Sequence, residues 1–204
     1  MVKILSISFQ RSRACLTLDD DRQVWLSRAD LLESGWQENT AVEEEAFDRF
    51  ILLHQYPQAL NQAVSLLAGR PCSKGEIAQN LKRHRYTEEV IGLVLCKLEK
   101  EKLLNDRDFG DLWVQQRSAK YGSRRLRLEL RQKGVSEETA DEALAQLSDE
   151  EELETALKFA RKAWSRIRPG EDPRKSRQKV IASLVRKGFS WDLARRASDD
   201  AEER

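Results

Sequence analysis

The side chains best suited to chemistry in this sequence are basic, and they gather in one short segment. Residues 117–133 contain seven lysines and arginines and a single acid, Glu129. Clustered ammonium and guanidinium groups bind phosphates or carboxylates, so this segment favours contact with a polyanion or with an acidic protein surface. A second segment, residues 158–187, has eleven basic residues against Glu171 and Asp172. A solvated helix face has the same composition, which leaves a purely structural role open for either segment.

The first basic segment contains a predicted helix over residues 124–132 whose two faces differ. At about 100° per residue, Leu126 and Leu130 share one face, which we expect to lie in the core. Leu128 falls on the opposite face. The arginines around it are Arg124, Arg125, Arg127 and Arg131. An apolar side chain among arginines suits a protein partner, although Leu128 could instead contact a neighbouring repeat. We expect reversal of the first three of these arginines to glutamate to leave the fold intact.

Groups for catalysis or metal binding are few and scattered. The two histidines are His54 and His84, and the three cysteines are Cys15, Cys72 and Cys96. The spacing of these residues suggests no metal site or catalytic triad, and the sequence has no phosphate-binding glycine loop or zinc-protease motif. We therefore expect no enzyme activity and no cofactor. An odd number of separated cysteines favours a reduced, cytoplasmic protein, and the apolar segments are too short for a signal peptide or a membrane span.

The elements that position these residues change type along the chain. Residues 2–27 alternate apolar and polar side chains in three stretches, which predicts a small antiparallel sheet. Ser27 can then cap a short helix that ends at Gly35.

A second helix is predicted before the pattern changes. Thr40 with Glu43 can form the capping box of this helix, which we expect to run towards Pro57. We assign residues 1–56 to an N-terminal strand-rich segment with short helices, and we expect the rest of the chain to fold as a helical protein when this segment is deleted.

After Pro57 the pattern is helical, and it repeats. Leu81, Leu130 and Leu184 each precede a basic link, an apolar residue and a Thr or Ser that can cap the next helix. The period of about 50 residues predicts one three-helix unit used three times. Such units bury little core alone, so we expect them to pack on their neighbours in an elongated stack. The predicted fold class is mainly α: three tandem helix-turn-helix-like repeats after a small N-terminal antiparallel sheet.

The three predicted units contain the same series of helices. The first helices are expected over 59–68, 108–119 and 151–166. The middle helices are expected over 74–83, 123–132 and 174–186, and the third helices follow Thr87, Ser136 and Ser190. We assign residues 57–107, 108–150 and 151–204 to repeats one, two and three.

Caps and breakers support these bounds. Ser73 with Glu76 can form a capping box, and Gly134 and Gly188 can end two of the middle helices. The first unit has no such glycine before Tyr86, which should lengthen or distort that helix end. Residues 169–173 read as a loop within the third unit. Three tryptophans at apolar helical positions are expected in the core: Trp113, Trp164 and Trp191.

The repeat region resembles the RecX family over residues 59–198. The first part of the signature includes Arg70-Pro71-Cys72-Ser73 and Leu103-Leu104-Asn105-Asp106. The most specific part lies in the second unit and is carried by Trp113-Val114, Arg117, Lys120-Tyr121-Gly122, Arg125-Leu126, Glu129-Leu130 and Lys133-Gly134-Val135. Together with the basic segment, this motif indicates the candidate partner-binding residues Arg117, Lys120, Tyr121, Gly122, Arg124, Arg125, Arg127, Leu128, Arg131 and Lys133.

The resemblance implies a function that spacing alone does not. RecX-like proteins are small bacterial cytoplasmic regulators without catalytic activity. The resemblance implies that this protein binds the RecA–DNA filament along its groove and inhibits its ATPase, strand-exchange and co-protease activities. Weak, sequence-independent contact with DNA in the filament would accompany this. We also expect a monomer when the protein is free, and no membrane contact.

Two other functions stay open at this point. A helical-repeat DNA-binding protein or transcriptional regulator is the main alternative, because the repeats are helix-turn-helix-like. In that motif the last helix enters the major groove by its N-terminal residues. Here those helices begin with Glu88-Glu89, Glu137-Glu138 and Trp191-Asp192, and the acids would repel phosphates. The third possibility is a structural scaffold for another partner.

Overall fold

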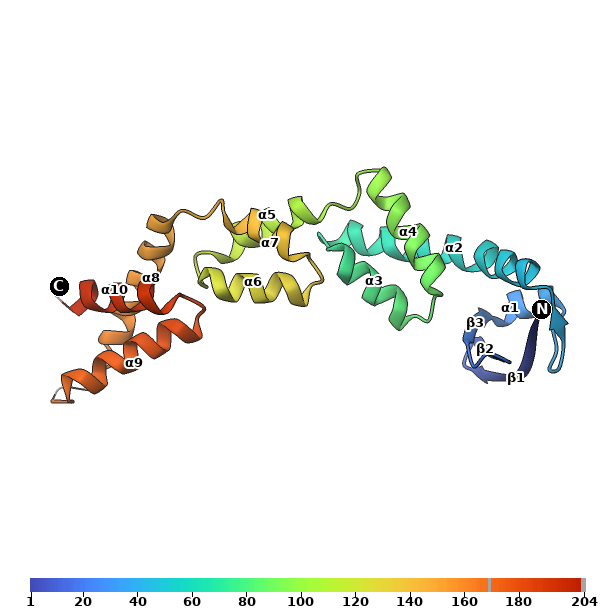
Figure 1. The fold of residues 1–204 in the computed structure, drawn as a ribbon, viewed down its shortest axis with the longest axis horizontal. Coiled ribbons are helices and arrows are strands. Elements are labelled where there is room, and N and C mark those ends of the chain that lie inside the picture. The colour runs from blue at the N-terminus through green and yellow to red at the C-terminus, as the bar shows by residue number, and fades with distance from the viewer. Residues whose placement is uncertain (169, 203–204) are drawn as a thin grey trace. The chain divides into compact units, whose positions relative to one another are not determined.

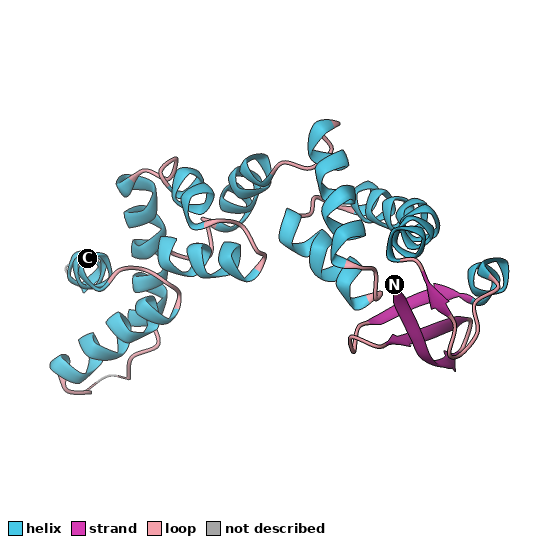
Figure 2. Ribbon diagram, turned by 45° about the vertical axis from the view of Figure 1, so that its right-hand side comes forward, coloured by secondary structure: helices cyan, strands magenta, loops and turns pink. Residues whose placement is uncertain are grey.

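The computed structural model of this chain describes residues 1–168 and 170–202. A small sheet is followed by helices (Figure 2). The chain divides into two compact units, Met1–Leu104 and Asn105–Arg204. The predicted fold class, mainly helical with an N-terminal antiparallel sheet and three three-helix repeats, is confirmed. Pro169 of the predicted loop and residues 203–204 of the predicted third repeat lie outside the described residues.

The sheet has four antiparallel strands in the order β3-β2-β1-β4. The strands are β1 Val2–Gln10, β2 Arg13–Leu18, β3 Gln23–Ser27 and β4 Ala41–Val42. The first three were predicted by alternation, and their inward residues, such as Ile4, Leu16 and Leu26, are buried. The fourth strand escaped prediction because two residues are too few to show a period.

Helix α1, Arg28–Ser34, follows the predicted caps. Ser27 accepts a hydrogen bond from the Asp30 backbone N–H, and the Asp30 side chain accepts one in return from Ser27 N–H. Gly35 ends the helix in the left-handed conformation, with a φ of 67°.

The expected capping box of Thr40 and Glu43 is wrong. Thr40 instead lies at the edge of the sheet, where its carbonyl accepts a hydrogen bond from Ile4 N–H at 2.9 Å. Helix α2, Glu44–Gly69, begins four residues later, and Glu43 makes no side-chain cap. Pairing with β1 thus holds Thr40 in the sheet and away from the start of α2.

The helix break expected near Pro57 is also wrong, because α2 continues through this residue. Proline leaves the carbonyl four residues earlier without its helical partner. That carbonyl belongs to Leu53. This residue is 67% exposed, which places the unpartnered carbonyl on a part of α2 that is open to solvent. The N-terminal half of α2 covers the sheet with Phe47 and Ile51, and the C-terminal half packs into the first repeat (Figure 1).

Gln55 joins these two halves of the first unit. Its side chain is buried; its Nε2 donates to the Trp25 carbonyl at 2.8 Å, and its Oε1 accepts from Thr87 N–H at 3.0 Å. The sheet and the first repeat therefore share α2 and a buried amide. Deletion of residues 1–56 would remove Gln55 and the first part of α2, and the folding of the remaining chain stays a prediction.

The first repeat is completed by α3, Lys74–Arg83, and α4, Glu88–Lys100. The predicted capping box of Ser73 and Glu76 starts α3, and Thr87 caps α4 as expected. Leu81 lies fully buried in the core between the three helices.

The end of α3 is neither longer nor distorted, contrary to expectation. Arg85 takes the place that Gly134 and Gly188 hold in the other repeats, and it adopts the same left-handed backbone, with a φ of 63°. Tyr86 N–H donates to the Leu81 carbonyl, as Val135 N–H does to Leu130. The helix end therefore has the same geometry as in the other two repeats, although an arginine stands where they have a glycine.

The second unit contains two further repeats. The second repeat comprises α5 Asp106–Arg117, α6 Ser123–Gln132 and α7 Glu137–Leu144. The third comprises α8 Asp149–Trp164, α9 Pro173–Arg186 and α10 Trp191–Glu202. Each repeat has its own buried cluster. Trp113 and Trp164 are partly buried against these clusters, but Trp191 is 51% exposed beside Arg195, so its predicted core position is wrong.

Candidate protein-interaction site

Helix α6 presents the predicted basic face to solvent. Leu126 and Leu130 are fully buried on the opposite face, as expected, and Leu128 is 48% exposed. Arg124 and Arg131 are exposed and form no ion pair with any described residue. Two unpaired guanidinium groups therefore flank an exposed apolar side chain.

Gly122 lies at the start of α6 and in contact with the third repeat. Its backbone N–H donates to the Lys187 carbonyl at 3.0 Å, and Arg124 N–H donates to the Gly188 carbonyl at 3.1 Å. Between Gly122 and Arg124, Ser123 donates its N–H to the Glu152 carboxylate of the third repeat at 2.7 Å. These contacts use three N–H groups at a helix end that has no side-chain cap of its own. The position of Gly122 is thus explained by packing between repeats.

Glu129 is the centre of a buried hydrogen-bond network in the second repeat. Its carboxylate accepts two hydrogen bonds from Arg117, at 2.7 and 2.8 Å, one from Arg125 at 3.0 Å and one from the Trp113 indole at 3.2 Å. Burial alone would raise the pKa of Glu129, but the hydrogen bonds and the positive charge of Arg117 outweigh it, and the pKa is lowered. The hydrogen bond to Glu129 in turn raises the pKa of Arg117.

Aromatic rings extend this network. The Arg117 guanidinium lies 4.7 Å from the centre of the Tyr121 ring and 5.0 Å from that of Trp113. Lys133 lies 4.2 Å from the Trp113 ring, and Lys187 of the third repeat lies 5.5 Å from that of Tyr121. Cations over aromatic faces hold these side chains in place.

The ten candidate residues therefore separate into three groups. Residues turned into the repeat or held by its network are Arg117, Tyr121, Gly122, Arg125 and Lys133. Arg127 is exposed but pairs with Asp141 at 2.7 Å. Residues that face solvent without an ion pair to a described residue are Lys120, Arg124, Leu128 and Arg131.

This division corrects one expectation from the sequence. Reversal of Arg125 would place a carboxylate beside Glu129, and reversal of Arg127 would place one beside Asp141. We therefore now expect the triple reversal to perturb the repeat itself, since only Arg124 among the three is free of such a contact. A signal for this was present in the sequence, since Glu129 is the single acid in the basic segment and lies four residues after Arg125.

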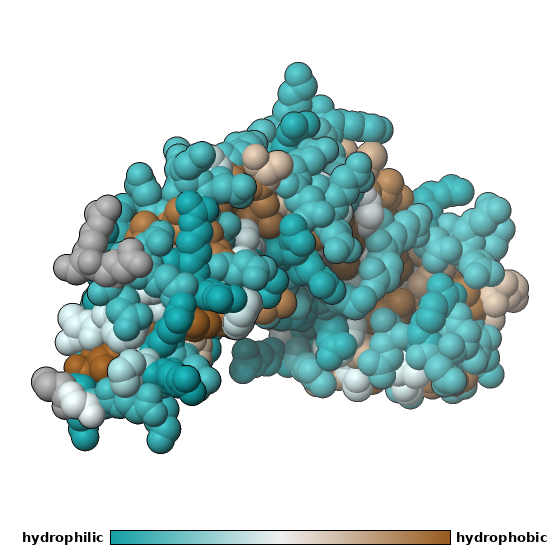
Figure 3. All heavy atoms as spheres, turned by 60° about the vertical axis from the view of Figure 1, so that its left-hand side comes forward, coloured by the Kyte–Doolittle hydropathy of each residue, from teal (hydrophilic) through white to brown (hydrophobic). Residues whose placement is uncertain are grey.

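Other kinds of site are not found in the part of the chain that the structure describes. It contains no group of three or more histidines, cysteines or acids that could hold a metal ion. None of its helices is long and apolar enough to cross a membrane. The face seen in Figure 3 is mainly hydrophilic, with hydrophobic surface in small separate areas.

Comparison with known proteins identifies the repeats. Profiles of the first, second and third three-helix domains of RecX match residues 59–98, 105–144 and 149–197. Regulatory protein RecX of Amycolatopsis mediterranei is 33% identical over 142 residues, which cover 69% of this chain and 81% of the relative. The chain belongs to the RecX family. Regulatory protein RecX of Listeria monocytogenes is 28% identical over 98% of this chain and 76% of the relative.

Solved RecX structures share the fold. A crystal structure of regulatory protein RecX superposes with a TM-score of 0.68 at 25% identity and covers all of both chains. RecX from Lactobacillus salivarius, at 23% identity, covers 73% of this chain with the same TM-score. Membership of the RecX family of regulatory proteins supports a regulatory role and not an enzymatic one.

Proposed function

We propose that this protein binds the RecA–DNA filament and restrains its ATPase, strand-exchange and co-protease activities. The observation that carries the proposal is the solvent face of α6, where Arg124 and Arg131 flank the exposed Leu128. Arginines around one apolar anchor are typical of surfaces that bind acidic protein partners. The RecX resemblance supplies the partner, and membership of the family supports it.

The binding energy would come from both the apolar Leu128 and the two arginines beside it. Leu128 would be removed from water on contact, and the unpaired guanidinium groups would meet carboxylates of the partner. Charge would contribute chiefly to the rate and orientation of association, so binding should weaken as salt rises. The residues inside the repeat, such as Glu129 and Arg117, would hold α6 in position.

The alternative function, sequence-specific DNA binding, is disfavoured by the third helices of two repeats. Glu88 and Glu89 at the start of α4 are exposed, as are Glu137 and Glu138 at the start of α7. Carboxylates at the end of a helix that should enter the major groove would face phosphates of the same sign.

The experiment is to measure ATP hydrolysis by RecA on single-stranded DNA with increasing amounts of the purified protein. We expect hydrolysis to fall at stoichiometric or lower amounts. The double variant Arg124→Glu with Arg131→Glu should lose this inhibition and keep the melting temperature. Arg49→Glu, an exposed arginine on α2, is the matched control and should inhibit like the unaltered protein.

Unchanged hydrolysis at stoichiometric protein would contradict the proposal. Full inhibition by the double variant would remove α6 from the binding surface. Tight binding to one duplex sequence over others would favour the DNA-binding alternative.

A further inference from the structure

A basic cavity lies in the first unit, where the sheet meets the first repeat. Its volume is about 680 Å³. The lining residues are Gln10, Arg11, Arg13, Gln23, Trp25, Arg83 and Arg85. We name it the junction cavity. It shares no residue with the α6 surface, and nothing in the proposed function uses it.

Two segments distant in sequence build the junction cavity. Arg11 lies in the turn between β1 and β2, and Arg13 begins β2. Arg83 ends α3, and Arg85 lies in the link to α4. Arg13 joins the two segments through a hydrogen bond from its guanidinium to the His84 carbonyl. The positions of Arg13 and Arg85 are therefore set by contacts between the sheet and the repeat.

The charge of the junction cavity is not balanced. None of its four arginines forms an ion pair with a described residue. Asp30 is the acid whose charge acts on Arg13, and burial nevertheless lowers the pKa of that arginine. Like charges gathered in a concave site repel one another and concentrate a positive potential, which attracts an anion.

Two of the four arginines also have a strained backbone conformation. Arg11 has a φ of 54° and Arg85 a φ of 63°, in the left-handed region that non-glycine residues rarely adopt. Gly134 and Gly188 stand at the positions that correspond to Arg85 in the other repeats. Residues with a strained backbone conformation tend to occur at functional sites. Here two such arginines line the same cavity.

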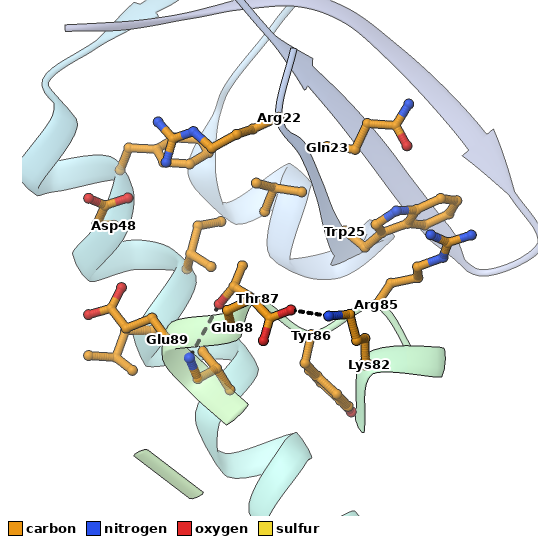
Figure 4. Close-up of a pocket in the computed structure, with 15 residues that line it drawn as sticks. Arg22, Gln23, Trp25, Asp48, Lys82, Arg85, Tyr86, Thr87, Glu88 and Glu89 are labelled. Carbon is orange, nitrogen blue, oxygen red and sulfur yellow. Dashed lines mark hydrogen bonds and ion pairs between the residues drawn. The ribbon is translucent and has the colours of Figure 1, made fainter. Parts of the chain in front are cut away.

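Trp25 supplies an aromatic surface in the same place. Its side chain is half-buried on β3, and the guanidinium groups of Arg13 and Arg85 lie 5.9 and 6.0 Å from its ring centre. Figure 4 shows Arg85 extending beside the Trp25 ring, with Gln23 on the same strand. A ring among arginines that have no ion pair with a described residue combines a stacking surface with phosphate ligands.

We propose that the junction cavity binds single-stranded nucleic acid, with its arginines on the phosphodiester groups and Trp25 against a base. Guanidinium groups match phosphate oxygens in two-pronged hydrogen bonds. A cavity of this volume lies in the range of small-molecule sites and can admit a splayed base with its phosphate. A duplex keeps its bases stacked and cannot place one against Trp25. Recognition through phosphates and a ring face is independent of base sequence.

The test uses the full chain without RecA, so its result is separate from that of the proposed function. Binding of a fluorescein-labelled oligothymidylate is followed by anisotropy at several salt concentrations. Arg11→Gly with Arg85→Gly removes two guanidinium groups and relieves both strained backbones. We expect affinity to fall about tenfold at low salt and the salt slope to decrease by roughly 1.4, for two phosphate contacts. The melting temperature should stay the same or rise.

Lys102→Gly is the matched control. Lys102 lies in the same unit, also has a left-handed backbone with a φ of 57°, and is outside the cavity. This variant loses one positive charge and the same kind of strain, and it should bind the oligonucleotide like the unaltered protein. Oligonucleotide should also quench tryptophan fluorescence, and Trp25→Phe should remove part of that quenching.

Three results would overturn the proposal. The first is unchanged affinity in the Arg11 and Arg85 double variant. The second is equal affinity for a duplex of the same length, which would show that no base reaches Trp25. The third is displacement of the oligonucleotide by polyglutamate at matched charge, which would assign the cavity to acidic protein segments.

Discussion

A Cβ atom on Gly122 would lie 2.5 Å from the carbonyl carbon of Gly188, so these two glycines bring the backbones of the second and third repeats into direct contact. Real Cβ atoms do not approach backbone so closely, and backbone cannot move aside as a flexible side chain can. The close approach also allows the hydrogen bonds from Gly122 and Arg124 to the third repeat. Gly122, the glycine of the family motif, therefore allows the second and third repeats to pack closely against each other.

Gly122→Ala should destabilise the second unit. We expect the free energy of unfolding to fall by about 1–3 kcal/mol, the usual cost of overpacking a tight contact. Urea denaturation measures the change. Gly92→Ala in α4 is the control, because a Cβ there meets nothing within 4 Å. That substitution should stabilise by about 0.5–1 kcal/mol, since alanine is the better helix former. Equal stability of the Gly122 variant and the unaltered protein would contradict the close approach.

The stability of the second repeat should depend on pH through Glu129. Its pKa is lower in the folded protein than the unfolded value of 4.5, because Arg117 and Arg125 bond the ionised form. The contribution of Glu129 to the free energy of unfolding is therefore complete above pH 4.5. It is lost as the pH falls through the lower pKa of the folded state. Glu129→Gln should cost about 2 kcal/mol at neutral pH, and the difference from the unaltered protein should shrink in acid.

Melting temperatures across this acid range test the Glu129 prediction. The exposed Glu138→Gln is the control and should follow the unaltered protein at every pH. A difference for Glu129→Gln that stays constant down to low pH would assign its effect to packing and not to charge.

Arg125→Glu and Arg124→Glu should differ in stability although the two residues are neighbours. Arg125 bonds the Glu129 carboxylate, so its reversal removes a bond and adds a like charge. Because Arg125 is partly exposed, we expect a loss of about 1 kcal/mol. Arg124→Glu should leave thermal unfolding unchanged. Equal melting temperatures for the two variants would show that the Arg125 contact contributes little.

Leu128→Ala should affect binding and not stability. The side chain is 48% exposed, so its truncation should leave the melting temperature nearly unchanged. If it is buried against the filament, affinity should fall by on the order of 1 kcal/mol or more. Leu32→Ala, at a residue that is 84% exposed on α1, is the control for loss of exposed apolar surface. A lower melting temperature with unchanged affinity would instead place Leu128 in a structural contact.

Gln55→Ala should destabilise the first unit. The change leaves the Thr87 N–H without its partner and leaves the Trp25 carbonyl with only the longer, 3.5 Å hydrogen bond from Arg13, at a cost of about 1–3 kcal/mol. Gln58→Ala, in which an exposed bond to Asp30 is lost, is the control and should change stability little. Thermal unfolding measures both. If the Gln55 variant melts like the unaltered protein, the sheet and the first repeat are not held together by this amide.

Much of the fold could be predicted because its signals are local. Ser27, Ser73 and Thr87 mark helix starts by their own side chains, and Leu126 and Leu130 mark a core face by their spacing. Capping and amphipathic spacing act within one or two helical turns, so they can be read from consecutive residues.

The errors arose where distant segments decide the outcome. Thr40 lies at the sheet edge because β1 offers a backbone partner, and Pro57 is tolerated inside α2 at a place where Leu53, whose carbonyl it leaves without a helical partner, is an exposed residue. Arg85 takes a glycine conformation within a cavity to which the sheet contributes Arg11 and Arg13. Such outcomes depend on tertiary contacts that outweigh local preference.

The amino-acid sequence by itself determined three helical repeats, the first three strands before them, the RecX resemblance and the basic character of α6. Only the tertiary structure decided which basic residues are available to a partner. Arg117 and Arg125 are held by the buried Glu129, whereas Arg124 and Arg131 face solvent. The physical reason is that a charge is recorded in the sequence, but its availability depends on which countercharges the fold brings within hydrogen-bond distance.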